Sequence, residues 1–407
     1  MPKKESTLLL YYKSDAKKYL SENFTVEKIF PLTPDTKAVI GKNTSSYIFD
    51  PLNQFSQYSH LRVVASVRSF ERKAIKAIEK DRTMTEAGKE TLISLLHVYL
   101  SSFNYLWFML RGTGPWIVHD GSKWVEESNL SRVCFILIER IISRKKGLFF
   151  FGQNTNQYGK KLIKIVNDIA VYLMKNKKII ITTGQSYGLK KLTKNDNGIL
   201  TIQLTQADKK SLFRTLKTLL ILMSPFSKRR NLSISPVKKI GNNYEKLISN
   251  LFHDCFDSRL NKTERIFIKN LNNAVIYTES IIDSSRQILQ KLSPKKIISH
   301  HLRWLDEAVL GQCGSELKIK TYLISHGSHP FPIYTVDEYE HRSLARGLLF
   351  SQFAHTLIAQ SPIAEKSINF FQPDSNYLNY KPILWAQKKS SSRKNTDGFR
   401  ILSAGTF

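Results

Sequence analysis

IKTYLISHGSHP, at residues 319–330, and TLIAQSPIAEKSINFF, at residues 356–371, are the two stretches that decide the fold. Each opens with a short apolar run that is typical of a buried strand, and the second continues into a helix that Ser361 is expected to cap. Just before them, an apolar strand pattern at residues 296–299 precedes a helical pattern at residues 304–314. Short apolar strands that alternate with helices predict an α/β fold with a parallel sheet.

Earlier parts of the chain supply further strand candidates around a long helical region. Apolar or β-branched runs at residues 8–12, 115–119, 178–182 and 198–205 are typical of strands, while helical spacing dominates much of the chain between them. The sequence therefore predicts one α/β domain at residues 1–387. It consists of a Rossmann-like parallel sheet with a large helical insertion at about residues 51–290.

The end of the chain has a different composition. Residues 388–397 (KKSSSRKNTD) are polar and rich in serine, which is typical of a linker. A strand candidate follows at residues 399–403, and then a turn that contains Gly405. Because a strand followed by a glycine-containing turn is how a Rossmann-like domain begins, residues 398–407 are predicted to start a second, truncated domain.

The charge balance is strongly positive. The chain has 62 Lys and Arg residues against 33 Asp and Glu residues, a formal net charge of +29. Such an excess favours an anionic partner, which could be a nucleic acid, an acidic membrane surface or a phosphorylated substrate. The densest basic cluster, residues 227–231, is expected in a loop, and lysines are otherwise scattered over most predicted helices. Since no nucleic-acid-binding motif occurs, nucleic acid is the weaker of these alternatives.

One uncharged segment, residues 91–110, is long enough to span a bilayer. It also contains His97, Asn104 and several serines, a mixture that fits a helix buried inside a domain better than one that faces lipid. The segment is therefore predicted to be a core helix, with a membrane span or docking on a membrane surface as alternatives. The N-terminus has no signal-peptide core, so a cytoplasmic place is expected, with contact to the inner membrane face as a further option.

Polar residues follow three of the predicted strands, where ligands bind in open parallel sheets. The three clusters are His119-Asp120-Gly121, His300-His301 and His326-Gly327-Ser328-His329. Adjacent histidines point in different directions from a strand end, so no metal site is predicted. The three cysteines are widely spaced, which supports neither a zinc site nor a disulfide framework.

Standard phosphate-binding motifs are missing from the sequence. It contains no G-x-G-x-x-G and no G-x-x-x-x-G-K-[ST]. Residues 183–186 (TGQS), after the strand at residues 178–182, could cradle a phosphate or form a plain loop. No cofactor is predicted.

The strand that ends in ISHGSHP, the TLIAQSPIAEKSINFF stretch and the closing FRILSAGTF together resemble the domain junction of GT-B glycosyltransferases. Among these the chain is most similar to bacterial surface-polysaccharide and capsule enzymes. The resemblance covers residues 294–407, and the helical region at about residues 51–290 has no counterpart in it.

The resemblance implies a GT-B-like glycosyltransferase that moves a sugar from a nucleotide-sugar donor to a surface-polysaccharide or lipid-linked acceptor. Residues 1–387 would be its acceptor side, and the donor would bind mainly to the truncated second domain, so the chain alone is expected to be inactive. The expected site residues fall into two groups. The catalytic residues are expected to be Asp120 or His119, as the base, and His326. The residues expected to bind substrate are Gly327, Ser328, His300, His301 and Ser361. The alternatives are a polyol-phosphate transferase of the same fold and a basic nucleic-acid-binding protein.

Overall fold

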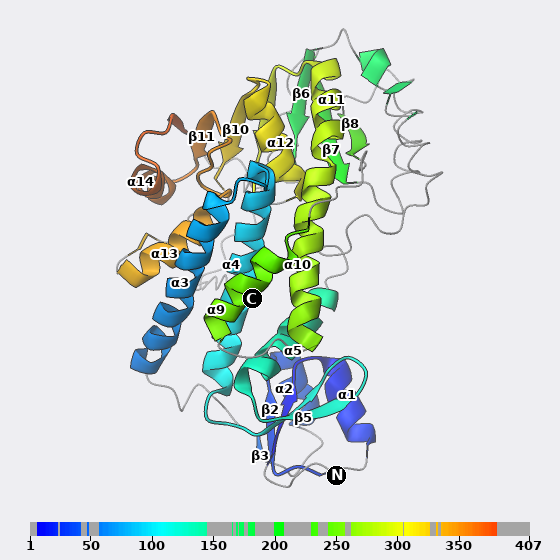
Figure 1. Ribbon diagram of the computed structural model, residues 1–407, viewed down its shortest axis with the longest axis vertical. Helices are drawn as coiled ribbons and strands as arrows, with labels where there is room; N and C mark the ends of the chain where they lie inside the picture. Colours follow the sequence, from blue (N-terminus) through cyan, green and yellow to red (C-terminus); the bar gives the residue numbers. More distant parts are fainter. Residues whose placement is uncertain are drawn as a thin grey trace, which may run out of the picture.

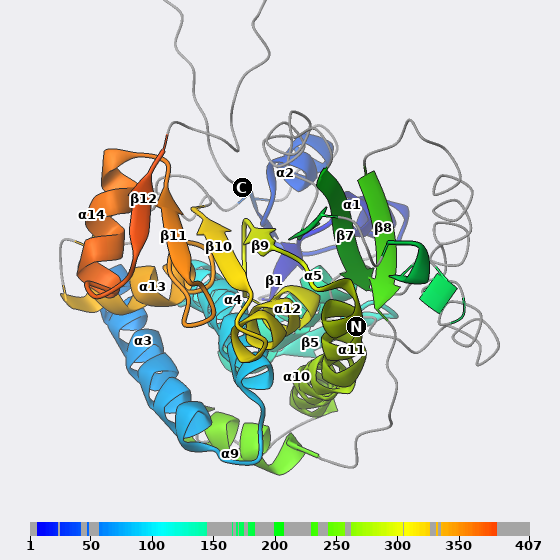
Figure 2. The ribbon, with the colours of Figure 1, turned by 90° about the horizontal axis from the view of Figure 1, so that it is seen from above.

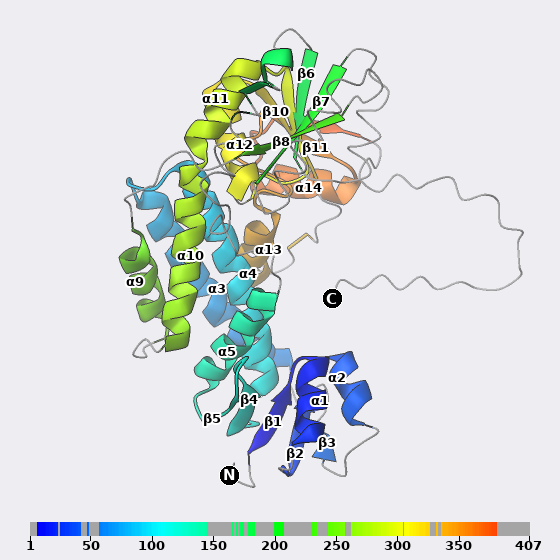
Figure 3. The same cartoon turned by 90° about the vertical axis from the view of Figure 1, so that its right-hand side faces the viewer.

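The chain forms two β-sheets that are joined by a layer of long helices (Figure 1). The computed structural model describes residues 6–22, 25–41, 47–48, 57–144, 165, 168–169, 171–174, 178–183, 199–206, 229–234, 243–256, 262–303, 305–325, 331–332 and 335–380. In Figure 3 the helical layer lies on one side, and the two sheets project from its two ends on the other side. The two sheets thus lie at opposite ends of the helical layer and on the same side of it.

The first sheet is built by the N-terminal part of the chain. Its strands have the order β3-β2-β1-β4-β5, and all neighbours are parallel except the pair β4 and β5. They are β1 (Thr7–Leu10), β2 (Lys28–Pro31), β3 (Tyr47–Ile48), β4 (Trp116–His119) and β5 (Trp124–Glu127). Two short helices, α1 (Lys13–Ser21) and α2 (Pro34–Ile40), connect the first three strands.

Alternating apolar residues bury both faces of this sheet. Leu8 and Leu10 of β1 share a core with Ala16 of α1 and Ile40 of α2, whereas Leu9 between them belongs to the core of the helical layer. This two-residue period is what a strand covered by helices on both faces requires. The strand predicted at residues 8–12 is therefore present, as β1.

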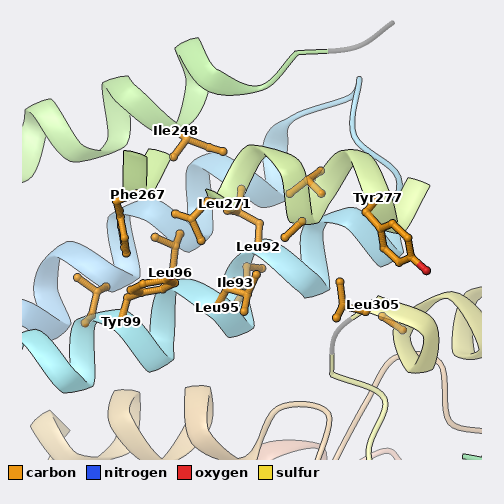
Figure 4. Packing of buried hydrophobic residues seen from close by; sticks show 14 of the residues in the cluster. Leu92, Ile93, Leu95, Leu96, Tyr99, Ile248, Phe267, Leu271, Tyr277 and Leu305 are labelled. Atoms are coloured by element: carbon orange, nitrogen blue, oxygen red, sulfur yellow. The ribbon is translucent and has the colours of Figure 1, made fainter. Parts of the chain in front are cut away.

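The helical layer contains α3 (Gln57–Lys80), α4 (Glu86–Leu110), α5 (Leu130–Arg144), α9 (Glu245–Phe256), α10 (Lys262–Ser280) and α11 (Ile282–Leu292). Helix α4 lies at its centre. Figure 4 shows Leu92 and Leu96 of α4 packed near Leu271 of α10 and Ile248 of α9. Thr85 caps α4 by accepting a hydrogen bond from the backbone N–H of Gly88 at 3.1 Å.

The prediction of a core helix at residues 91–110 is confirmed. Most apolar side chains of α4 are buried, among them Leu92, Leu95, Leu100 and Leu106. By length and composition α4 could cross a membrane, but 67% of its most apolar window is buried inside the protein. Helices buried on most of their surface are common in the cores of large domains, so burial accounts for the apolar composition.

The second sheet is entirely parallel and has the strand order β12-β11-β10-β9-β6-β7-β8 (Figure 2). Its strands are β6 (Lys178–Thr182), β7 (Ile199–Gln206), β8 (Arg229–Ile234), β9 (Lys296–Ser299), β10 (Lys320–Ile324), β11 (Thr356–Ala359) and β12 (Tyr377–Asn379). Three helices belong to this part of the chain, α12 (Leu305–Glu316), α13 (Thr335–Ala345) and α14 (Pro362–Phe371).

Three expectations from the sequence need correction or lie outside the described residues. The single sheet expected at residues 1–387 is two sheets, because β6 pairs with β9 rather than with any strand of the N-terminal part. Arg229 and Arg230, expected in a loop, are the first residues of strand β8. The linker at residues 388–397 and the strand at 398–407 lie outside the described residues.

A buried ionic cluster lies in the helical layer. Glu71 of α3 is paired with Arg68 one turn earlier, and its other carboxylate oxygen lies 2.8 Å from Nδ1 of His97 on α4. Arg68 also donates to the hydroxyl of Ser101 at 2.9 Å. All three charged or titratable side chains are almost completely buried. Burial acts to raise the pKa of Glu71, but hydrogen bonds and charge from His97 and Arg68 hold it below its usual value.

Neutral His97 should make stability depend on pH. Burial, assisted by the charges of Arg68 and Arg303, lowers the pKa of His97, although Glu71 acts in the opposite direction. The folded state therefore binds fewer protons than the unfolded state, whose histidine titrates near 6.5. We expect the stability that neutral His97 contributes to be present above about pH 6.5 and to be lost as the pH falls below it.

The midpoint temperature of thermal unfolding is measured for the wild type and for His97→Asn between about pH 7.5 and 5. Asparagine keeps a donor near the position of Nδ1 but does not titrate, so the midpoint of the variant should fall less over this range. Equal losses in the two proteins would rule out His97 as the source of the pH dependence.

Candidate functional site

The second sheet has the strand order of a Rossmann fold, with β6, β7 and β8 on one side and β9 to β12 on the other. From β8 the chain crosses back to place β9 beside β6. This reversal between β6 and β9 is a topological switch point, where helices leave opposite faces of the sheet and a ligand can bind beyond the strand ends. A ligand-binding site is therefore expected at the residues just after β6 and β9.

Polar side chains from both strands are connected at this switch point. The hydroxyl of Thr183, which follows β6, is hydrogen-bonded to that of Ser299, the last residue of β9. Ser299 in turn is bonded to the carbonyl of His301, and Nδ1 of His300 lies 3.3 Å from the carbonyl oxygen of Thr183. The rings of His300 and His301 meet edge to face, with their centroids 4.4 Å apart. Two imidazoles and two hydroxyls thus gather at one strand junction.

A pair of acidic residues extends this cluster. Oε1 of Glu307, in the first turn of α12, lies 3.3 Å from Nε2 of His301, and the Glu307 side chain is hydrogen-bonded to that of Asp306. Burial raises the pKa of both carboxyl groups, and the charge of Glu307 raises the pKa of Asp306 further. The arrangement is a chain in which the carboxyl group of Asp306 supports that of Glu307, which in turn faces an imidazole. Neither acid stands out in the amino-acid sequence.

The neighbouring strand ends have a more structural role. Ser361 accepts a hydrogen bond from the backbone N–H of Ala364 at 3.1 Å, which confirms it as the cap of α14. Ser325, after β10, accepts from the backbone N–H of Gln360 at 3.2 Å. His326, Gly327 and Ser328 lie outside the described residues, so their expected roles stay predictions.

The first sheet has a switch point of its own. Its parallel strands β3, β2, β1 and β4 repeat the order of a Rossmann half, and the reversal falls between β1 and β4. After β1, the Tyr12 hydroxyl donates to the carbonyl oxygen of Arg140 on α5 at 2.9 Å. The guanidinium of Arg140 binds Asp15 of α1 through two hydrogen bonds of 2.8 Å each. This bidentate pair fixes α5 against α1, the helix that follows β1.

His119 and Asp120 lie at the same switch point, after β4. The buried ring of His119 lies beside Lys18 of α1, with 2.9 Å between Nε2 and Nζ. Asp120 is exposed, and one of its carboxylate oxygens accepts from the backbone N–H groups of Ser122 and Lys123 and from the Ser122 hydroxyl, at 2.8–2.9 Å. These bonds lower the pKa of Asp120 despite a contribution from burial that raises it. Asp120 thus stabilises its own turn, which weakens it as a candidate base.

The expected site residues are therefore divided between two places. His119 and Asp120 lie at the edge of the first sheet, whereas His300, His301 and Ser361 lie at the edge of the second. Among the described residues, no group of three or more His, Cys, Asp or Glu side chains could hold a metal ion. A scan against known protein families finds no match, and a search of curated proteins finds no significantly similar sequence.

Proposed function

We propose that this protein transfers a sugar from a nucleotide-sugar donor to a glycan or lipid-linked acceptor. The observation that carries the proposal is the presence of two Rossmann-like sheets, each with polar side chains at its own switch point. A reaction that joins two substrates needs two binding places, and a single helical layer holds these two in one molecule. The positive charge of the chain is suited to substrates that carry phosphate.

The donor is assigned to the edge of the second sheet, within residues 1–387, and this assignment replaces the expectation that the donor binds to the truncated domain and that the chain alone is inactive. His300 offers an imidazole at the switch point, and in its protonated form this ring can donate to an oxygen of a diphosphate. When the sugar leaves, negative charge grows on the phosphate, and hydrogen-bond donors fixed at that point lower the barrier. The acceptor is assigned to the edge of the first sheet.

Glu307 and His301 are assigned the role of the base. An acceptor hydroxyl has to lose its proton as its oxygen attacks the sugar carbon, and the bond from that carbon to the phosphate oxygen breaks. An imidazole backed by a carboxylate is a common proton acceptor in enzymes. The 3.3 Å contact between Nε2 of His301 and Oε1 of Glu307, on the same edge as the proposed donor site, supports this assignment, which requires the buried Nδ1 of His301 to become accessible when the acceptor binds.

Binding of nucleotides to the full chain tests the proposal. Titration calorimetry with UDP, GDP, TDP and CDP should identify at least one that binds, and His300→Ala should weaken that binding about 10- to 150-fold, the value of one hydrogen bond to a charged group. His355→Ala is the matched control, because His355 precedes β11 and thus lies at the opposite edge of the same sheet. It should leave the affinity unchanged.

Other outcomes separate the alternatives. Turnover of a CDP-polyol, with no turnover of any nucleotide sugar, would point to polyol-phosphate transfer. Failure to bind any nucleotide, together with tight binding of an oligonucleotide that falls steeply with salt, would reject the transferase in favour of nucleic-acid binding. If His300→Ala and His355→Ala weaken nucleotide binding equally, the donor does not bind at the β6–β9 switch point.

A further inference from the structure

We infer that Lys18 and His119 form an oxyanion site at the edge of the first sheet, which takes a phosphate group of the acceptor. The existence of the site follows from the geometry alone, whereas its use for an acceptor rests on the proposed function. The ligand class is a phosphate ester, either soluble or in a lipid headgroup.

The hydrogen bond from Gly121 determines which nitrogen of the His119 ring carries the hydrogen atom. The backbone N–H of Gly121 donates to Nδ1 of His119 over 3.1 Å. Nδ1 must therefore carry a lone pair, and in a neutral imidazole the single ring hydrogen then belongs to Nε2. Gly121 has φ +109°, a left-handed backbone conformation that glycine adopts at no steric cost, so this bond is built into the turn after β4.

Lys18 and His119 thus place two hydrogen-bond donors next to each other. Nζ of Lys18 lies only 2.9 Å from Nε2 of His119, and an ammonium group has no lone pair to accept the ring hydrogen. Two donors side by side repel each other unless an acceptor shared by both is bound beside them. An oxygen of a phosphate group meets this need, because it accepts several hydrogen bonds and its charge offsets that of Lys18.

The surroundings of His119 favour an anion. Burial lowers the pKa of His119, and the positive charges of Lys18 and Arg140 lower it further, against the opposite effects of Asp15 and Asp120. Asp15 is already bound by Arg140, and Asp120 by its own turn. The remaining carboxylate, Glu22, lies 3.8 Å from Lys18 on the same helix and accepts from the indole N–H of Trp124. The described bonds of these three carboxylates thus include none that bridges Lys18 and His119.

The place of the pair in the fold supports a ligand rather than a purely structural contact. Lys18 is half-exposed on α1, and His119 is the last residue of β4, so the pair lies at the switch point between β1 and β4. The indole of Trp124 meets the His119 ring edge to face, with the ring centroids 5.0 Å apart. A phosphate bound by Lys18 would thus have a partly exposed aromatic surface nearby, which suits the sugar or the lipid that carries it.

The test compares two adjacent lysines in the full chain. Lys18→Gln should weaken the binding of inorganic phosphate, followed by titration calorimetry, by about tenfold or more. Lys17→Gln removes the same charge from the next residue of α1, which faces solvent, and should leave the affinity within about twofold. His119→Gln should also weaken binding, and its circular dichroism should first establish that it is folded.

Vesicles distinguish the two sources of the phosphate. Binding to phosphatidylcholine vesicles that contain phosphatidic acid, if it depends on Lys18 but not on Lys17, would support a lipid headgroup. Lys18-dependent binding of free phosphate alone would support a soluble ester. Equal losses in Lys17→Gln and Lys18→Gln, or no loss in either, would overturn the inference. Nucleotide binding at the second sheet, measured in the same variants, should not change, so failure of the oxyanion site and failure of the donor site are separable.

Discussion

Replacement of Glu307 by glutamine should lower the rate of sugar transfer about 10²- to 10⁴-fold, the usual contribution of a general base. Glutamine has nearly the same shape but cannot hold a negative charge beside Nε2 of His301, so the imidazole becomes a weaker proton acceptor. The affinity for the nucleotide should change little, because Glu307 is not assigned to the diphosphate. The rate is measured as release of nucleoside diphosphate from the nucleotide sugar that binds, with water or an added glycan as acceptor.

The matched control is Glu316→Gln, at the other end of the same helix. Glu316 is paired with Arg286 at 2.8 Å on the surface, far along α12 from His301, and its loss should leave the rate unchanged. The pH–rate profile gives a second readout, since loss of the base should flatten its acidic limb. A rate in folded Glu307→Gln equal to that of the wild type would show that the base lies elsewhere.

Replacement of Glu71 by glutamine should destabilise the protein by about 3–5 kcal/mol, the cost of removing one partner of a buried ion pair. Arg68 and Glu71 are both almost completely buried, so the guanidinium would lose this carboxylate in a place that water does not reach. The free energy of unfolding is measured by urea denaturation. Glu79→Gln serves as the control, because its partner Arg346 binds it at 3.0 Å on a carboxylate that is about half exposed.

A double variant sharpens this prediction. Arg68→Met with Glu71→Leu removes both charges and keeps much of the volume, so it should recover a large part of the lost stability. If Glu71→Gln costs no more than Glu79→Gln, the buried cluster contributes nothing beyond an ordinary surface ion pair.

The local elements of the second half could be predicted because their signals are local. The runs at β9, β10 and β11 are short and apolar, and the cap of α14 is encoded by Ser361 and the proline after it. The division into two sheets could not be predicted, because strand patterns do not specify which strands pair. β6 and β9 are neighbours in space although two strands and three helices of the described part of the chain lie between them in sequence, so only tertiary packing decides their pairing.

The candidate site was predictable only in part, for the same reason. His119 and His300 could be found because each directly follows, or ends, an apolar strand. Asp306 and Glu307 could not, since acidic residues in the first turn of a helix are common for the sake of the helix dipole alone. Lys18 carries no signal at all in the sequence. Its importance appears only where α1 brings it beside a histidine 101 positions away.

The core described above runs without interruption from Leu9 in the first sheet, through Leu92 in α4, to Ile181 in the second sheet. Each half also has a smaller core of its own, but both share this largest core, so neither is expected to be stable as an independent domain. In an ancestral lineage, exchange of one substrate-binding half for another by recombination would expose apolar surface at the junction. New substrate specificity is therefore expected to arise by point substitution at the strand ends, without exchange of either half.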